Sequence, residues 1–322
     1  MAESLLEVKN VKKHFPLNKG LFQKRHLVRA IDGISFDLKE KETLGIVGES
    51  GCGKSTLGKM IMQIMEPSEG AIYFQGENLN HLPSKKLREQ RKNFQTIFQD
   101  PYASLNPKMK VGEILAEPFY VNNICKKVEA EKRIKVLLER VGLKAGDVDK
   151  FPHQFSGGQR QRIGIARALS LNPKLIVADE AVSALDVSIQ SQILNLLIKL
   201  KEDLKLSYIF ISHNLAVVQH ISDRVAVLYL GQLVEIGDKT TLFENPLHPY
   251  TKALLSATPR PDRNIKKERI VLKGEIPSPS NPPAGCPFHT RCPEAMDVCK
   301  SEKPVLQTKE NGSMVACHLY ET

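Results

Sequence analysis

A glycine-rich stretch at residues 48–56 constrains this chain more than any other part of its sequence. It fits the pattern G-x-x-x-x-G-K-[ST], in which glycines let successive backbone N–H groups turn toward a phosphate. Residues 43–47 before it have the pattern of a short buried strand, and apolar residues follow it at helical spacing: Leu57, Met60, Ile61 and Ile64. A strand, a glycine loop and a helix in this order predict a phosphate site at the positive end of the helix.

Every residue of this loop is a candidate for contact with ATP: Gly48, Glu49, Ser50, Gly51, Cys52, Gly53, Lys54, Ser55 and Thr56. Lys54 is expected to reach the β- and γ-phosphates, and the Ser55 hydroxyl is expected to ligate Mg²⁺. The alternative is a glycine-rich turn that matches the pattern by chance. The flanking strand and helix argue against it.

Composition narrows the class of protein. The chain has 322 residues, of which 41% are hydrophobic and 25% charged, as expected for a globular protein with a sizeable core. No apolar run approaches the ~20 residues needed to cross a bilayer, and the first residues lack a signal-peptide layout. We therefore expect a cytosolic chain that meets a membrane only at its surface.

The formal net charge of +10 has three readings: nucleic acid, anionic lipid, or a nucleotide site with a solvated basic surface. Basic residues are spread along the chain without a long run that interleaves with aromatic residues. The third reading is favoured, with anionic lipid as a secondary effect and no nucleic-acid partner.

Alternating strand and helix patterns predict an α/β fold. Strands are expected at residues 6–11, 34–38, 71–74, 175–178, 208–211, 225–228 and 234–236. Residues 16–29 are expected to form a loop, 67–70 a turn and 230–233 a hairpin turn. Helical periodicity marks residues 105–150 and one later helix face, formed by Ile193, Leu196, Leu197, Leu200 and Leu204. Beyond about residue 245 prolines become frequent and periodicity fades, which predicts a separate appendix.

Two further stretches suit nucleotide chemistry. The apolar residues 175–178 lead into Asp179, which can hold Mg²⁺, and Glu180, which can polarise a water for attack on the γ-phosphate. Two surface carboxylates are the alternative. Residues 155–162 place a Ser-Gly-Gly run before a helical pattern, which predicts a second anion cradle or an ordinary helix cap.

Taken together, these stretches make residues 5 to about 240 resemble the ATPases of ABC transporters. The phosphate loop resembles the Walker A motif and residues 175–180 the Walker B motif. The other matching positions are Phe15 for the adenine-stacking aromatic, Gln99 for the Q-loop, Ser156, Gly157, Gly158 and Gln159 for the signature, Asp186 for the D-loop and His213 for the switch histidine. Ala181, Phe155 and Phe15 depart from common family residues, but none of these changes removes a catalytic group.

The resemblance implies a P-loop nucleotide-binding domain with a RecA-like core, an antiparallel β subdomain and a helical subdomain at about residues 100–170. It implies head-to-tail pairing with a second ATPase subunit, so that each ATP lies between the Walker motifs of one chain and the signature of the other. Gln99 would sense Mg²⁺ and the coupling helix of a membrane subunit, and His213 would hold the γ-phosphate. A packed core histidine is the alternative for His213.

Residues 98–107, residues 247–254 and the cysteine-containing tail resemble the ATPases of oligopeptide and dipeptide importers. This implies an ATPase domain at 1–244, an extension at 245–322, two transmembrane permease subunits, an extracytoplasmic peptide-binding protein and a place on the cytoplasmic face of the membrane. A nickel importer stays open as an alternative cargo. ABC-type ATPases that act on DNA usually carry long insertions between the Walker motifs, which the short gap here argues against.

The tail contains four of the six cysteines: Cys286, Cys292, Cys299 and Cys317. Clustered thiols in a reducing compartment suggest a metal site more than disulfides. Structural zinc sites usually have a tight C-x₂₋₄-C pair, which is missing, whereas wider gaps suit a cluster. We expect a structural [4Fe–4S] cluster, in keeping with relatives that have such a tail. Zn²⁺ with His289 or His318 is the second choice, and unliganded thiols are the third.

Overall fold

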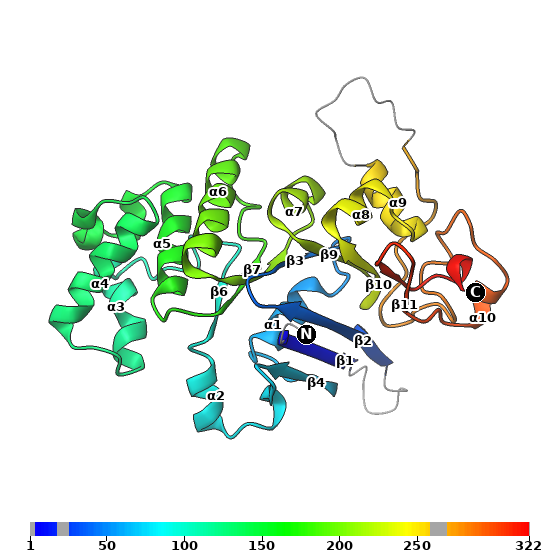
Figure 1. Ribbon diagram of the computed structural model, residues 1–322, viewed down its shortest axis with the longest axis horizontal. Helices are drawn as coiled ribbons and strands as arrows, with labels where there is room; N and C mark the ends of the chain where they lie inside the picture. Colours follow the sequence, from blue (N-terminus) through cyan, green and yellow to red (C-terminus); the bar gives the residue numbers. More distant parts are fainter. Residues whose placement is uncertain (1–3, 18–25, 258–268, 322) are drawn as a thin grey trace. The chain divides into compact units, whose positions relative to one another are not determined.

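The computed structural model describes residues 4–17, 26–257 and 269–321 of the chain. These divide into two compact units, one of Met1–His81 with Ile211–Thr322 and one of Leu82–Phe210. Each unit is described separately below and can be followed in Figure 1. Among the described residues, every helix is either too short or too polar to cross a membrane.

An antiparallel sheet with the strand order β2-β1-β4-β5 opens the first unit (Figure 1). Its strands are β1 (Ser4–Leu17), β2 (His26–Lys39), β4 (Glu69–Phe74) and β5 (Glu77–Asn78). The predicted strands are confirmed but are longer than expected. The ends of the predicted loop 16–29 belong to strands because Pro16 pairs with Leu27 and Phe15 with Val28, and residues 18–25 lie outside the described part. Likewise, the predicted turn 67–70 is wrong at Glu69 and Gly70, which already belong to β4.

A second group of strands in the first unit has the order β11-β12-β10-β9-β3. β3 (Thr43–Val47) is buried throughout and runs parallel to β9 (Arg224–Tyr229). β10 (Gln232–Asp238) returns antiparallel through the predicted hairpin turn, where Leu230 and Gly231 both have positive φ. The helices of this unit are η1 (Leu79–His81), α1 (Lys54–Ile61), α7 (Leu215–Ile221), α8 (Lys239–Glu244) and α9 (Pro249–Ser256).

The C-terminal tail pairs with this group of strands, so the structure does not confirm a separate appendix. β12 (Met314–Val315) pairs with β10, and β11 (Gln307–Thr308) pairs with β12. The edge of β10 offers unpaired backbone groups that the tail can cover. Two short helices, α10 (Val298–Ser301) and η4 (His318–Tyr320), lie in the same segment. The hydrophobic anchor of the tail is Phe288, whose ring is 1% exposed.

The second unit contains β6 (Phe94–Ile97), which is parallel to β7 (Leu175–Asp179), and β7 neighbours β8 (Ser207–Ile211). Its helices are α2 (Ser84–Gln90), α3 (Val111–Val121), α4 (Lys127–Arg140), η2 (Ala145–Asp149), η3 (Pro152–Gln154), α5 (Gly157–Leu169) and α6 (Val187–Leu204). The predicted helical region 105–150 is confirmed as α3, α4 and η2. β6 was not predicted.

Helix periodicity predicts most of the buried positions in α1 and α6, but not all of them. In α1 the predicted positions Leu57, Met60 and Ile61 are buried, but Ile64 is 62% exposed because the helix ends at Ile61. In α6, Leu194 is buried although it was not among the predicted positions. Ile64 was predicted to be buried because periodicity alone does not show that α1 ends at Ile61.

Candidate active site

The phosphate-loop residues 48–56 lie between β3 and α1, as predicted. Lys54 opens α1, and its side chain is buried, with Nζ donating to the carbonyl oxygens of Gly48 at 2.7 Å and Glu49 at 3.0 Å. Gly53 precedes the helix as its N-cap and gives no side-chain cap. The loop thus leads directly into the positive end of α1, and the ammonium of Lys54 is held inside the same loop.

Glycine is required by geometry at two positions of this loop. A Cβ on Gly53, whose φ is +105°, would lie 2.4 Å from the Ala30 carbonyl oxygen. A Cβ on Gly48 would lie 2.2 Å from the Leu228 carbonyl oxygen. The N–H of Gly231 also donates to the Cys52 carbonyl at 2.9 Å. At Gly48 and Gly53 the loop is thus packed so closely against backbone of β9 and β2 that a side chain has no room.

Tyr250 in α9 is a site residue that the sequence analysis did not predict. Its hydroxyl accepts a hydrogen bond from the Glu49 N–H at 2.8 Å, and the residue is completely buried. Tyr250 belongs to residues 247–254, which were noted only as a mark of a transporter subfamily. Its place beside the phosphate loop could not be predicted because the two segments are about 200 residues apart in sequence.

Phe15 and His213 also belong to the first unit. Phe15 is half-buried in β1, with the Lys13 ammonium 5.4 Å from its ring centroid. His213 follows β8 and is exposed, so the alternative of a packed core histidine is wrong. The next residue, Asn214, caps α7 by accepting from the Ala216 N–H at 3.0 Å. The cap fixes the chain direction directly after His213.

In the second unit, the predicted carboxylates lie at the carboxyl end of β7. Gln99 Nε2 donates to Glu180 Oε2 at 2.9 Å, so the predicted Q-loop and Walker B residues meet. Glu180 has φ +49°, a conformation that is uncommon for residues other than glycine and clusters at functional sites. Asp179 and Glu180 are both partly buried, which does not fit the alternative of two ordinary surface carboxylates.

The predicted signature residues begin α5 in the second unit. Ser156 is the N-cap: its Oγ accepts from the Gln159 N–H at 3.3 Å, and Gln159 Oε1 accepts from the Ser156 N–H at 3.0 Å. A Cβ on Gly158 would lie 2.5 Å from Ile189 Cγ2 of α6. Ser156 therefore does cap α5, as the alternative interpretation expected. The second anion cradle stays a prediction. Asp186 is the N-cap residue of α6.

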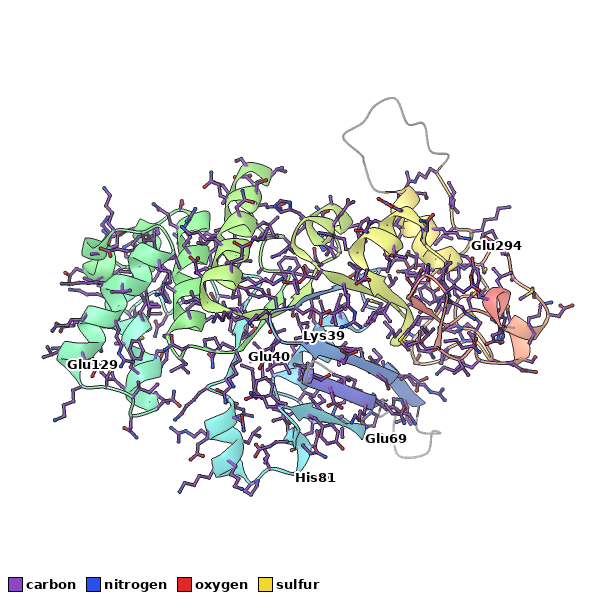
Figure 2. All side chains as sticks on the ribbon, viewed as in Figure 1. Lys39, Glu40, Glu69, His81, Glu129 and Glu294 are labelled. Carbon is purple, nitrogen blue, oxygen red and sulfur yellow. The ribbon has the colours of Figure 1, made fainter. Side chains whose placement is uncertain are left out.

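The four tail cysteines belong to the first unit. The Cys286 N–H donates to the Cys299 carbonyl at 2.9 Å, and both residues are buried. Burial, helped by the charges of the other cysteines, raises the pKa of Cys286 to about 11 and that of Cys317 to about 12. Burial is also the main cause that raises the pKa of Cys292, which lies just before Glu294 (labelled in Figure 2).

The structure gives no direct support for a metal site at these cysteines. Within the residues that the structure describes, no group of three or more His, Cys, Asp or Glu side chains is arranged to hold a metal ion. The predicted iron–sulfur or zinc site thus lacks geometric support. Both ring nitrogens of His318 have other partners, since Nε2 lies 3.0 Å from the Glu302 carbonyl oxygen and Nδ1 lies against Glu321. His289 Nδ1 lies 2.8 Å from the Cys286 carbonyl oxygen.

Comparison with known families gives two separate matches. A family model described as "ABC transporter" matches residues 31–183. A second, described as "Oligopeptide/dipeptide transporter, C-terminal region", matches residues 234–299. The second match covers β10, α8, α9 and the segment that carries three of the four tail cysteines.

Curated relatives match along nearly the whole chain. The oligopeptide transport ATP-binding protein AppF of Bacillus subtilis (strain 168) is 55% identical over 322 residues, covering 99% of this chain and 98% of AppF. The dipeptide transport ATP-binding protein DppF of Escherichia coli (strain K12) is 50% identical over 319 residues, covering 98% of this chain and 95% of DppF.

Solved structures share the fold. The ATP-binding cassette MJ0796, in a dimeric post-hydrolysis state bound to ADP and Pi, aligns with a TM-score of 0.64 and 29% identity. That alignment covers 73% of this chain and 98% of MJ0796. CbiO1 from Clostridium perfringens, part of the transporter complex cbiONQ, aligns with a TM-score of 0.66 and 27% identity over 76% of this chain and 92% of cbiO1. The predicted ABC cassette fold is thereby confirmed.

Proposed function

The chain belongs to the ATP-binding subunits of oligopeptide and dipeptide ABC transporters, and we propose that the residues described above form one half of each of two shared ATP sites. ATP hydrolysis coupled to peptide import is its activity. The peptide-transporter match at residues 234–299 favours this cargo over the nickel alternative, and the full-length similarity to transport ATPases favours it over an ATPase that acts on DNA.

The catalytic roles follow from chemistry. Phe15 stacks on adenine, residues 48–56 wrap the phosphates, and Lys54 neutralises their charge. The exposed Ser55 hydroxyl and the Asp179 carboxylate at the end of β7 are oxygen ligands of the kind that Mg²⁺ prefers. Mg²⁺ bound there would neutralise charge on the phosphates.

Glu180 polarises the attacking water, with Gln99 beside it and His213 on the γ-phosphate. The observation that carries this assignment is the 2.9 Å hydrogen bond between Gln99 and Glu180, because it holds the carboxylate in one orientation. The left-handed backbone of Glu180 supports the same role, since strained residues persist where function requires their geometry.

Each site is completed by the second subunit. Ser156, Gly157, Gly158 and Gln159 present the start of α5, where the cap uses two of the local donors and leaves others for the γ-phosphate of ATP bound to the partner. Asp186 lies at the neighbouring start of α6. MJ0796, a cassette of similar fold, is described as a dimer. We place the pair beneath two permease subunits on the cytoplasmic face of the membrane, with an extracytoplasmic protein delivering the peptide.

Two inactive variants test the shared site. In Lys54→Ala the phosphate loop fails, and in Ser156→Arg the signature is blocked, so each variant alone should hydrolyse almost no ATP. If sites are shared head to tail, mixing the variants restores one intact site in each mixed pair. ATPase activity of the mixture that stays at the level of the separate variants, under conditions in which wild-type pairs are active, would contradict a shared site.

For the tail, we propose that Cys286, Cys292, Cys299 and Cys317 hold a [4Fe–4S] cluster with a structural role. The support is that the tail packs two of these residues together: the Cys286 N–H donates to the Cys299 carbonyl at 2.9 Å, and both residues are buried. The wide spacing of these cysteines in the sequence, without a tight C-x₂₋₄-C pair, also suits a cuboidal cluster better than a single zinc ion.

Metal analysis decides this proposal. After anaerobic purification, the wild type should contain about four iron and four sulfide per chain, and Cys299→Ser should contain much less. Cys125→Ser is the matched control, because Cys125 is a free cysteine that is not among the four proposed ligands and should not affect the iron content. One zinc per chain without iron or acid-labile sulfide would refute the cluster.

A further inference from the structure

An arginine of the cysteine-bearing tail reaches the phosphate loop. Arg291 Nη1 donates to Glu49 Oε2 at 2.7 Å and Arg291 Nη2 donates to Glu49 Oε1 at 3.1 Å. This is a two-pronged pair between a planar guanidinium and a carboxylate, the strongest and most directional kind of ion pair between side chains. It joins residues that are 242 positions apart in sequence.

The pair is shielded from water. The Arg291 side chain is 8% exposed and that of Glu49 is 25% exposed. Arg291 Nη1 also lies 3.5 Å from the Tyr229 hydroxyl, and the guanidinium carbon lies 5.9 Å from the Tyr229 ring centroid. Arg291 Nε is buried without a hydrogen-bond partner among the described residues. Glu49 is therefore the main polar contact of the Arg291 side chain.

The tail holds Arg291 in this place. The Arg291 N–H donates to the Phe288 carbonyl at 2.9 Å. The ring of Phe288 packs edge-on against Tyr229, with centroids 5.2 Å apart, and lies 5.4 Å from the ring of Tyr250. Because Phe288 and Arg291 lie between Cys286 and Cys292, the fold of the cysteine segment determines where the guanidinium lies.

The carboxylate that Arg291 holds is poorly suited to its surroundings. Glu49 belongs to a loop that receives a triphosphate, and an uncompensated negative charge there would repel it. The same carboxylate, if released, would compete with the phosphates for the nearby ammonium of Lys54, which already contacts the Glu49 carbonyl oxygen at 3.0 Å. The ion pair cancels this charge and draws it aside, while Tyr250 holds the Glu49 N–H.

We propose that Arg291 is a positioning residue for ATP binding, through which the C-terminal tail neutralises and orients Glu49 in the phosphate loop. The inference rests on the proposed role of residues 48–56 in holding phosphates. It gives the tail a part in the nucleotide site that is separate from any metal it binds.

Nucleotide affinity of the purified full chain tests this inference. Arg291→Met should weaken ATP binding about tenfold, as loss of supporting residues around a charged ligand typically does. Arg291→Lys keeps the positive charge but not the two-pronged hydrogen bonding of the guanidinium, and it should lose less ATP affinity than Arg291→Met. Adding Glu49→Gln to Arg291→Met removes the unpaired charge, so ATP affinity should recover to within about threefold of the wild type. Affinity for adenosine, which has no phosphate, should be the same in all variants.

The control is another ion pair made by the same tail. Lys303 Nζ lies 3.3 Å from Asp32 Oδ2 on β2, and Lys303→Met should leave ATP affinity unchanged. ATP binding by Arg291→Met at wild-type strength, or a double variant no better than Arg291→Met, would overturn the inference. Lys54→Ala separates the two proposals: if it loses ATP while Arg291→Met does not, only this inference fails, and if it binds ATP normally, both fail.

Discussion

Acid should destabilise the chain by protonating His248, which lies at the N-cap of α9. Its side chain is 1% exposed, and its Nδ1 accepts a hydrogen bond from the Tyr250 N–H at 3.0 Å. Burial, together with a smaller contribution from the charge of Lys252, lowers the pKa of His248 from 6.5 to about 3. In the unfolded chain the imidazole has its ordinary pKa of 6.5. Between pH 6.5 and about pH 3 the unfolded state therefore binds a proton that the folded state does not bind.

The sign and size of the effect follow from this difference. Because the folded pKa is depressed, the stability linked to His248 is fully present above pH 6.5 and is lost as the pH falls toward 3. The loss is about 1.4 kcal/mol per pH unit, so it reaches roughly 2 kcal/mol at pH 5, and it cannot exceed roughly 5 kcal/mol in total. The α9 start also carries Tyr250, so its loosening should release the Glu49 N–H from the tyrosine hydroxyl.

The assay compares urea unfolding at pH 7.5 and pH 5 for the wild type and two variants. His248→Asn keeps a cap acceptor but cannot titrate, so it should lose about 2 kcal/mol less than the wild type on acidification. His81→Asn, which replaces an exposed histidine in η1 (labelled in Figure 2), is the matched control and should follow the wild type. Burial raises the pKa of Glu235, so protonation of this residue at low pH favours the folded state, opposite to the effect of His248. Glu235 is present in every variant, so it does not account for a difference between them. Equal pH dependence in His248→Asn and the wild type would refute this reasoning.

Three further predictions concern the nucleotide site. Gly53→Ala, which puts a Cβ 2.4 Å from the Ala30 carbonyl at positive φ, should lower stability by roughly 1–3 kcal/mol and abolish ATP binding, and a normal urea midpoint would contradict this. Phe15→Ala should weaken ATP and GTP binding alike, by the ~1–3 kcal/mol typical of base stacking, and unchanged affinities in equilibrium binding would assign stacking to another aromatic residue. Tyr250→Phe leaves the Glu49 N–H without its acceptor and should lower the free energy of unfolding in denaturant by about 1–3 kcal/mol. A loss below about 0.5 kcal/mol would show that this hydrogen bond is dispensable.

Local features of the fold and the site could be predicted from the sequence because neighbouring residues cause them. The boundaries of β3 and the start of α1 at Lys54 follow from an apolar run and a glycine loop. The carboxylates at the end of β7 were predicted for the same reason. Spacing rules of this kind need only a few consecutive residues to be informative.

Features that depend on distant pairing could not be predicted. Leu17 and His26 extend β1 and β2 into the expected loop because they pair with each other, not because of their own propensities. The tail has weak periodicity, yet Val315 finds a partner in Glu235 of β10. Arg291 likewise gave no signal as a site residue, since its role depends on a carboxylate far away in the sequence.

ATP turnover by Glu180→Gln tests the central claim most directly. The measurement is made in an assembly in which this chain supplies both sites, so that a partner's intact site cannot mask the effect. Loss of the water-polarising carboxylate should reduce turnover about 10²–10⁴-fold while ATP binding is retained and the ATP-bound dimer accumulates. Turnover at the wild-type rate would remove Glu180 from catalysis and contradict the account.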